Sequence, residues 1–242
     1  MAAEDVKRII RESIAKDQLI DIADLLRSTR KTAGEHAGAM GLAGRFALQI
    51  AGFGAYAIQN KRLPDLTLLQ GGHVIEGQNF PGTELRSYQP ICRYGRVLVG
   101  KASIQDPGEL PSQNITRANG ATVNVKHGST ACFPGFGPKP PVEDVIYALL
   151  LTCRDRNDPE RYTHVAIAVL EPDFSGFIFY ESLDTFIAGY GDAGEENSGN
   201  TGAVAAGPLP GLALKKGVVP FQGTEKQGDT GRGATGSDKK LP

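Results

Sequence analysis

Two long apolar runs constrain the fold of this chain more than any other feature of its sequence. They extend from Val145 to Cys153 (VIYALLLTC) and from His164 to Leu170 (HVAIAVL), and both are rich in β-branched and aliphatic residues. A strand covered on both faces has this composition, whereas a strand with one face in water alternates apolar and polar residues. We therefore expect both runs to be central strands of a sheet that is flanked by helices.

The chain before Asn60 has helical patterns. Apolar residues recur at helical spacing, with charges on the opposite side, from Val6 to Ile14 and again from Leu19 to Leu26. The stretch from Ala37 to Ile58 is apolar and rich in small residues, which predicts one buried helix. Its length approaches the roughly 20 residues that span a bilayer. Because Arg45 lies in its middle and anchors are missing at its ends, we expect no membrane span.

Short strand signals separated by turn sequences follow, up to about residue 189. The candidate strands are Leu66 to Leu69, His73 to Ile75, Thr83 to Tyr88, Arg96 to Val99 and Gly176 to Tyr180. The segment from Glu181 to Ala188 predicts a closing helix with Ser182 as its N-cap. The predicted fold is mixed α/β, with N-terminal helices packed on a mixed sheet of about five or six strands.

Three regions result from these patterns. Residues 1–60 form the helical region, residues 61–189 form a mixed-sheet core that would carry any catalytic site, and residues 190–242 form a Gly-rich flexible tail. The tail contains too few apolar residues to offset the entropy lost on ordering. Its Gly-rich sequence also lacks the Gly-Lys-Ser/Thr ending of a phosphate-binding loop.

Charge and cysteine content exclude several classes of protein. The net charge is -1, from 26 Lys and Arg against 27 Asp and Glu, so the chain as a whole is not a polybasic nucleic-acid coat and any site for a charged partner must be local. Its three cysteines are far apart and form neither a disulfide framework nor a zinc motif. The first 30 residues lack the apolar core of a signal peptide. We therefore expect a cytoplasmic protein.

Two carboxylates lie on neighbouring predicted strands. Asp65 follows Pro64 at the start of one strand, and Glu84 lies in the sequence Glu84-Leu85-Arg86 of another. If the GQNFPG turn pairs these strands, both carboxylates meet at one end of a small sheet, where they could bind Mg²⁺. Residues two apart on a strand share a face, so Arg86 would point into the same site and could contact a scissile phosphate.

These residues resemble the motif of the PD-(D/E)XK nuclease superfamily, to which many type II restriction endonucleases belong. The resemblance covers roughly Leu63 to Tyr180 and implies that Asp65 and Glu84 hold the metal, with Arg86 at the position usually held by lysine. Arginine stays protonated, so Arg86 could stabilise the attacked phosphate but could not accept a proton. The implied activity is Mg²⁺-dependent cleavage of double-stranded DNA by a homodimer, because each active site attacks one strand.

Other residues could fill these roles. Lys101, or Lys126 beside His127, could supply the cation, and Glu76 could replace Asp65 as the first metal ligand. A purely structural interpretation is also open. Asp65 would then be a turn or strand-entry aspartate, whereas Glu84 would lie with Arg86 on a solvated strand face that forms cross-strand charge pairs.

Basic residues are concentrated between Arg86 and Lys139, where seven Lys and Arg stand against two acids. Such a stretch could contact DNA phosphates with salt-dependent affinity, and the polar residues of the long loop from Asp106 to Pro141 could read base edges. The predicted DNA-binding residues are Arg93, Arg96, Lys101, Arg117, Lys126 and His127. Three aromatic residues could stack on bases: Tyr88, Tyr94 and Phe133.

Two other functions fit the same sequence. One is a non-catalytic binding or assembly protein, such as a phage or mobile-element component, in which the sheet is a scaffold and the two carboxylates need not meet. The other is a Cys-dependent hydrolase or toxin, with Cys132 as the nucleophile and His127 or His164 as its base.

Overall fold

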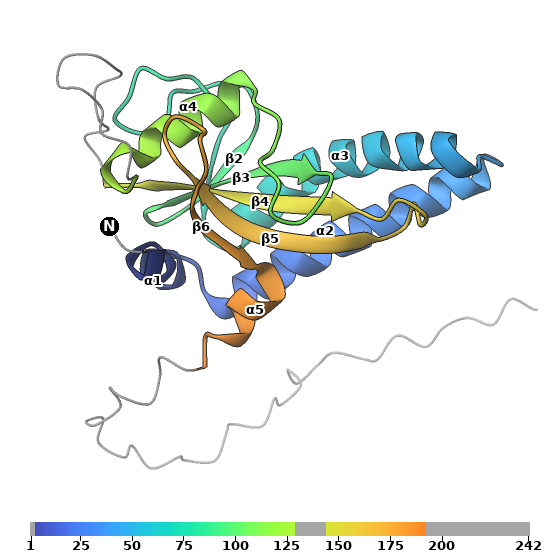
Figure 1. The fold of residues 1–242 in the computed structure, drawn as a ribbon, viewed down its shortest axis with the longest axis horizontal. Coiled ribbons are helices and arrows are strands. Elements are labelled where there is room, and N and C mark those ends of the chain that lie inside the picture. The colour runs from blue at the N-terminus through green and yellow to red at the C-terminus, as the bar shows by residue number, and fades with distance from the viewer. Residues whose placement is uncertain (1–2, 129–143, 192–242) are drawn as a thin grey trace, which may run out of the picture. The chain divides into compact units, whose positions relative to one another are not determined.

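The structure is a computed structural model that describes residues 3–128 and 144–191. The helices are α1 (Ala3–Ser13), α2 (Lys16–Ala39), α3 (Gly44–Leu69), α4 (Ile115–Val123), the short 3-10 helix η1 (Asn124–Lys126) and α5 (Leu183–Ala188) (Figure 1). The strands are β1 (His73–Ile75), β2 (Ile91–Tyr94), β3 (Val97–Ile104), β4 (Ile146–Arg154), β5 (Tyr162–Leu170) and β6 (Phe177–Ser182). The predicted mixed α/β class is confirmed. The predicted tail lies outside the described residues, apart from its first two.

The strands form one mixed sheet in the order β1-β2-β3-β4-β5-β6. Strands β3 and β4 pair in parallel, and the other four neighbouring pairs are antiparallel. The two apolar runs form β4 and β5 at the centre of the sheet, and every residue from Val145 to Cys153 and from Val165 to Leu170 is buried. The prediction of two central, doubly covered strands is therefore confirmed.

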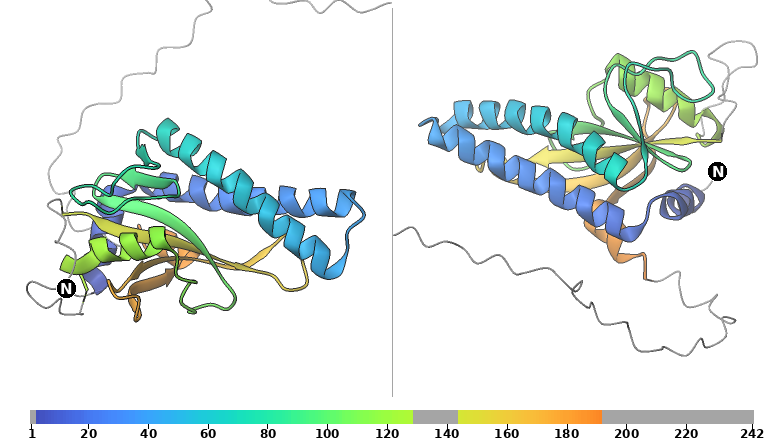
Figure 2. Two further views of the ribbon diagram at one scale, coloured as in Figure 1. Left: turned by 90° about the horizontal axis from the view of Figure 1, so that it is seen from above. Right: turned by 180° about the vertical axis from the view of Figure 1, so that it is seen from behind.

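Helices cover the two faces of the sheet (Figure 2). On one face, alternate strand residues such as Val99, Ile146 and Ile167 pack in a cluster with apolar residues of α1, α2 and α5. On the other face, the intervening residues, such as Leu98 and Leu149, pack in a second cluster with α4. The alternation of strand side chains therefore produces two separate cores, one on each side of the sheet.

Helices α2 and α3 form a hairpin that extends beyond one end of the sheet (Figures 1 and 2). Small residues allow close packing, since a Cβ placed on Gly54 would lie 3.3 Å from the Cβ of Ala33. The single helix predicted from Ala37 to Ile58 is wrong, because the chain turns between α2 and α3. Gly41 has a φ of 73° there, a left-handed conformation that suits glycine and ends the helix.

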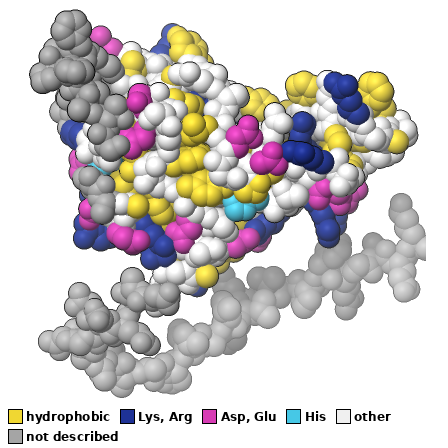
Figure 3. Space-filling model, in the orientation of Figure 1, with side chains coloured by type: hydrophobic (Ala, Val, Ile, Leu, Met, Phe, Trp, Pro, Cys, Tyr) yellow, Lys and Arg dark blue, Asp and Glu magenta, His cyan; other side chains and the backbone are white. Residues whose placement is uncertain are grey.

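The end of this hairpin exposes large apolar side chains. Figure 3 shows hydrophobic side chains there, next to Lys or Arg side chains. Met40, Phe46 and Phe53 are 65%, 69% and 66% exposed, respectively. Among the described residues, no helix is both long enough and apolar enough to cross a bilayer.

Helix α3 continues to Leu69, past the predicted boundary at residue 60, so the strand predicted from Leu66 to Leu69 is wrong. Pro64 removes one backbone donor without ending the helix, because the buried side of α3 repeats every four residues on both sides of it. The repeat is Ala47, Ala51, Ala55, Gln59, Leu63 and Thr67. Burial of this side favours helix over the local strand propensity of the last turn.

The strand predicted from Thr83 to Tyr88 is also wrong, because this segment makes one isolated β-bridge, between Asn79 and Arg86. Turn hydrogen bonds hold it instead, including one of 3.0 Å from the amide of Thr83 to the carbonyl of Phe80. The remaining strand predictions agree with β1, β3 and β6 to within a few residues. Ser182 caps α5 as predicted, by accepting a hydrogen bond from the amide of Thr185.

Candidate functional site

The residues of the predicted magnesium site lie on a helix and a loop. Asp65 is on the exposed side of α3, and Glu76 and Glu84 are exposed in the segment between β1 and β2. Neither an ion pair nor a hydrogen bond joins Asp65 to Glu84 in the described structure. Among the described residues, no group of three or more His, Cys, Asp and Glu side chains could hold a metal ion. The predicted convergence depended on two strands that do not form.

Arg86 contacts neutral groups. Its Nε donates a 3.0 Å hydrogen bond to the carbonyl of Gly77, and its guanidinium carbon lies 5.8 Å from the centre of the Tyr88 ring. The carbonyl of Arg86 accepts a hydrogen bond from Asn119 of α4. These contacts attach the segment before β2 to the α4 side of the sheet.

The predicted DNA-binding residues divide among three places. Arg96 pairs with Asp144 near the starts of β3 and β4. Lys126, which directly precedes His127, is exposed. His127 is only 1% exposed, and its ring lies 3.6 Å from the same Asp144 carboxylate. Burial lowers the pKa of His127, although the carboxylate opposes this effect. The ring of His127 therefore presents almost no surface to a large ligand.

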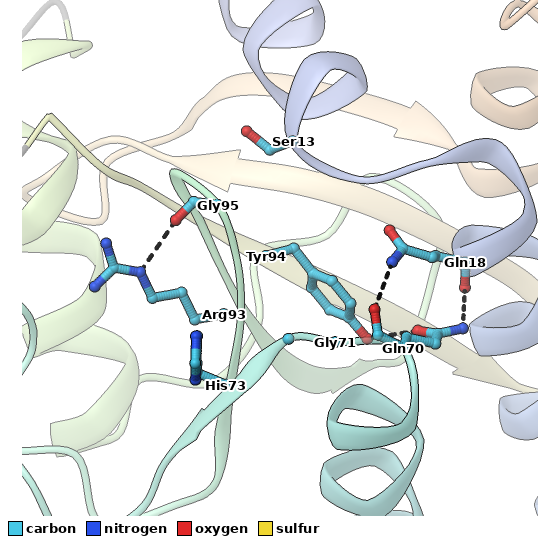
Figure 4. Close-up of a pocket in the computed structure, with 9 residues that line it drawn as sticks. Ser13, Gln18, Gln70, Gly71, His73, Arg93, Tyr94 and Gly95 are labelled. Carbon is cyan, nitrogen blue, oxygen red and sulfur yellow. Dashed lines mark hydrogen bonds between the residues drawn. The ribbon is translucent and has the colours of Figure 1, made fainter.

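Arg93 lines a polar hollow of about 450 Å³ between the α1–α2 turn, the end of α3 and β2. Figure 4 shows Arg93 beside His73, its partner across the β1–β2 pair, and shows Gln18 hydrogen-bonded to Gln70. Tyr94 is 3% exposed and bonds to Gln70, so it cannot act as the predicted stacking platform. The donors and acceptors in this hollow largely bond to one another.

The remaining predicted residues, Lys101 and Arg117, belong to a different cluster. The sheet face under α2 and α3 is apolar at Val97 and Val99 and becomes polar at Lys101 and Ser103, because alternate β3 residues share this face. Thr152, the β4 partner of Ser103, continues the polar surface with a 3.4 Å contact between the two hydroxyls. The polar surface lies toward the carboxyl ends of the two parallel strands.

Lys101 is held by groups of α3. Its Nζ donates hydrogen bonds to the carbonyl of Tyr56 (3.2 Å) and to the side-chain oxygen of Gln59 (3.4 Å). It also lies 4.1 Å from the centre of the Tyr56 ring, which is a cation–π contact. An ammonium has three donors, so these contacts leave one for an additional acceptor.

Gln59 connects Lys101 to a second buried cation. The amide nitrogen of Gln59 donates to the hydroxyl of Tyr162 (2.9 Å) and to that of Thr29 (3.1 Å). The guanidinium carbon of Arg30, on α2, lies 5.6 Å from the centre of the Tyr162 ring. Arg30 is 1% exposed, and its Nε and Nη2 have no hydrogen-bond partner among the described residues.

Arg117 adds a third cation, from α4. It donates hydrogen bonds to the carbonyl and hydroxyl of Ser112, and its Nε is buried without a partner among the described residues. A chain of contacts links it to α3. The amide of Tyr88 donates to Thr116, next to Arg117, and Gln89 donates to the hydroxyl of Tyr56. We refer to Arg30, Lys101 and Arg117 as the cation cluster.

Burial governs the electrostatics of the cation cluster. It lowers the pKa of Lys101 to about 8, and it lowers the pKa of both Arg30 and Arg117. Within residues 3–128 and 144–191, none of the three forms an ion pair. Desolvation of a cation without a carboxylate partner is costly. The arrangement is therefore complementary to a negatively charged ligand that would supply the missing partner.

Sequence reasoning found Lys101 and Arg117 but missed Arg30, Tyr56, Gln59 and Tyr162. A signal for two of them was present. Gln59 falls in the four-residue repeat of buried positions on α3, and Arg30 lies four residues after Leu26 on the buried side of α2. A polar residue in register with an apolar helix face is an informative exception.

The described residues do not test the cysteine hydrolase hypothesis. Cys132 lies outside the described residues. His164 contacts the hydroxyl of Tyr180 at 2.9 Å, and its ring stacks on the Tyr180 ring.

Comparisons of this chain with protein-family models, with curated proteins and with solved structures found no match.

Proposed function

We propose that this chain is a DNA-binding protein that holds phosphate groups at the cation cluster. The observation that supports the proposal is the presence of three buried or half-buried cations, from α2, β3 and α4, none of which forms an ion pair among the described residues. The carboxylate of Asp158 opposes the effect of burial on the pKa of Arg30 but does not outweigh it. Lys101 and Arg117 would contact phosphate oxygens. Arg30, which is deeper, would raise the positive potential at their position.

The energetics favour an anionic ligand. An unpaired buried cation destabilises the free protein by several kcal/mol, and a charge-assisted hydrogen bond to a phosphate would offset part of this cost. The spare donor of Lys101 is available for such a bond. Arg117 is partly exposed, and its buried Nε, which has no partner among the described residues, leaves the guanidinium poorly solvated. Lys101 contacts the Tyr56 ring, and Tyr56 also acts electrostatically on Arg117, so one ligand could engage both cations.

A polymeric phosphate fits better than a small anion because the cations come from three separate elements. The backbone of Arg86 is joined to α4 through Asn119, and its guanidinium, close to the Tyr88 ring, adds a further positive charge to the segment that contacts α4. The net charge of the chain is only -1, so attraction must come from a local surface of this kind. A duplex or a strand with several phosphates could neutralise more than one of these cations.

Salt-dependent binding tests this proposal. Fluorescence anisotropy with labelled DNA would be measured over a salt series for the wild type, Lys101→Met and Arg117→Met. Each variant should bind more weakly, and the slope of log K against log salt should fall by about 1 for each phosphate that the substituted side chain no longer neutralises.

Two exposed cations provide matched controls. Lys61→Met on α3 and Arg8→Met on α1 remove the same charges outside the cation cluster, and Arg8 already pairs with Asp5. Both should retain nearly wild-type affinity. If all four variants weaken binding equally, only net charge matters and the proposed site is wrong.

Mg²⁺-dependent cleavage is not the function that this geometry favours. Asp65, Glu76 and Glu84 are exposed side chains on a helix and a loop, and they are not part of any group of three or more potential ligands among the described residues, so we derive no metal-dependent step. The homodimer implied by double-strand cleavage stays a prediction. A cytoplasmic location is part of the proposal, and the buried free thiols of Cys92 and Cys153 support it.

A further inference from the structure

Exposed aromatic rings lie next to the cation cluster. Tyr56 is 46% exposed and Tyr88 is 58% exposed, although aromatic residues make up only 7% of the chain. Burying an aromatic ring is strongly favourable, so two exposed rings beside buried cations indicate a ligand that covers them.

The two tyrosines belong to the same network as the cations. The hydroxyl of Tyr56 accepts a 2.9 Å hydrogen bond from Gln89, and the amide of Tyr88 donates a 3.0 Å bond to Thr116. Each ring also has a cation near it, since Lys101 lies 4.1 Å from the centre of the Tyr56 ring and Arg86 lies 5.8 Å from that of Tyr88. Each of the two exposed rings is therefore accompanied by a positive group.

This combination suits unpaired nucleotides. Bases in a duplex are stacked on their neighbours and present only their edges in the grooves, so a tyrosine ring cannot reach a base face. A single strand exposes base faces and phosphates at the same time. Aromatic platforms beside cations bind such strands with about 1–3 kcal/mol from each stacked base.

The hydrogen bond from Gln89 restrains the Tyr56 ring before a ligand binds, whereas the bond to Thr116 fixes only the backbone of Tyr88. Tyr56 is further restrained because it lies within α3. A side chain that is already ordered loses less conformational entropy on binding, which favours affinity. The Tyr56 ring is therefore preorganised for stacking.

We infer that the DNA bound at the cation cluster is single-stranded, with unpaired bases stacked on Tyr56 and Tyr88. The inference rests on the proposed function, because the same cations supply the phosphate contacts. It adds the requirement that the bases be free to leave a duplex stack.

The test compares labelled oligothymidylate of about 20 nucleotides with a duplex of equal length and with an abasic strand of equal length. The oligothymidylate should bind at least about tenfold more tightly than either competitor. Tyr56→Leu and Tyr88→Leu should each weaken its binding about 5- to 100-fold without changing the salt slope, because stacking involves no counterion release.

Conservative variants separate stacking from folding. Tyr88→Phe keeps the ring and should bind like the wild type. Tyr56→Phe keeps the ring but loses the hydrogen bond from Gln89, so it should weaken binding much less than Tyr56→Leu does. Phe46→Leu removes an exposed ring at the hairpin end, outside the cluster. Fluorescence of 2-aminopurine within the strand should be quenched by the wild type and less by Tyr56→Leu. Thermal denaturation would confirm that every variant is folded.

The outcomes distinguish the two proposals. Equal affinity for oligothymidylate, duplex and abasic strand, with no effect of the tyrosine variants, would overturn the single-strand inference. If Lys101→Met still lowered affinity in that case, DNA binding at the cation cluster would stand. If neither set of variants had an effect, both proposals would be wrong.

Discussion

The Nζ of Lys101 lies 4.1 Å from the centre of the Tyr56 ring and bonds to two neutral oxygens, those of the Tyr56 carbonyl and the Gln59 side chain. These groups solvate the ammonium less well than water does, and burial lowers the pKa of Lys101 from 10.5 to about 8. A central strand that carries a poorly solvated cation is less stable than one that carries an apolar side chain. Lys101 therefore favours binding at the expense of folding.

We predict that Lys101→Met raises the free energy of unfolding at pH 7 by about 1–3 kcal/mol. The folded-state pKa is below the unfolded-state value, so between about pH 8 and 10.5 the unfolded state binds more protons and this residue destabilises the fold less as the pH rises. The advantage of the variant should be complete below pH 8 and disappear by about pH 10.5. Urea denaturation at several pH values measures it.

Lys61→Met is the control, because Lys61 is exposed on the same helix as Tyr56 and Gln59. Its unfolding free energy should stay within about 0.5 kcal/mol of the wild type throughout. A Lys101→Met protein that is less stable than the wild type at pH 7 would contradict the prediction. It would show that the cation–π contact and the two hydrogen bonds outweigh desolvation.

The pH dependence of DNA affinity forms a second prediction. A phosphate attracts only the protonated form of Lys101, so affinity should fall as the pH rises above about 8, by up to about tenfold per pH unit. Lys101→Arg keeps a positive charge at these pH values and should bind with little pH dependence. Anisotropy titrations between pH 7 and about 9.5 test both proteins. A decline of equal steepness in Lys101→Arg would assign the titration to another group.

The sequence predicted the central part of the fold because that part depends on local patterns. The apolar runs of β4 and β5 permit a single interpretation, and Ser182 has the cap chemistry that α5 requires. The strand predicted at the end of α3 was wrong for a physical reason. Pro64 followed by an apolar stretch is locally compatible with a strand, and only the packing of Leu63 and Thr67 against the rest of the protein favours the helix.

The candidate site was predictable only in part. Lys101 was found as one of the basic residues between Arg86 and Lys139, but its partners are distant in sequence, with Tyr56 and Gln59 45 and 42 residues away. No spacing rule connects such residues. The carboxylate pair illustrates the opposite error, because the spacing of Asp65 and Glu84 suggested convergence through two strands that do not form.

We expect Gln59 to stabilise the fold by joining Lys101 to residues of α2 and β5. Gln59→Leu removes the hydrogen bonds to Tyr162, Thr29 and Lys101, and should lower the free energy of unfolding by about 1–3 kcal/mol. In a Lys101→Met background the decrease should be smaller, because the ammonium that needs the Gln59 acceptor is already absent. The exposed Gln49→Leu on the same helix serves as the control. Additive effects in the double variant would show that the two residues are independent.

Gly120 should be essential for packing between α4 and the sheet. A Cβ at this position would lie 2.3 Å from a ring carbon of Tyr147, which is fully buried, so Gly120→Ala should destabilise the protein by about 2–4 kcal/mol. Gly38→Ala on α2 has no atom within 4 Å of the new Cβ and should be neutral or up to about 1 kcal/mol stabilising. Thermal denaturation of both variants measures the contrast. A Gly120→Ala protein as stable as the wild type would mean that Tyr147 can move.

The last prediction concerns the carboxylates of the nuclease hypothesis. Asp65 and Glu84 are exposed and make no contact with the cation cluster in the described structure, so Asp65→Ala and Glu84→Ala should bind DNA within about twofold of the wild type. Plasmid DNA incubated with the wild type and Mg²⁺ should remain intact, as it should with EDTA. Discrete fragments that appear with Mg²⁺ and vanish with EDTA and in both variants would instead establish a metal-dependent nuclease. Absence of the same cleavage in Lys101→Met would then place the cation cluster at its scissile phosphate.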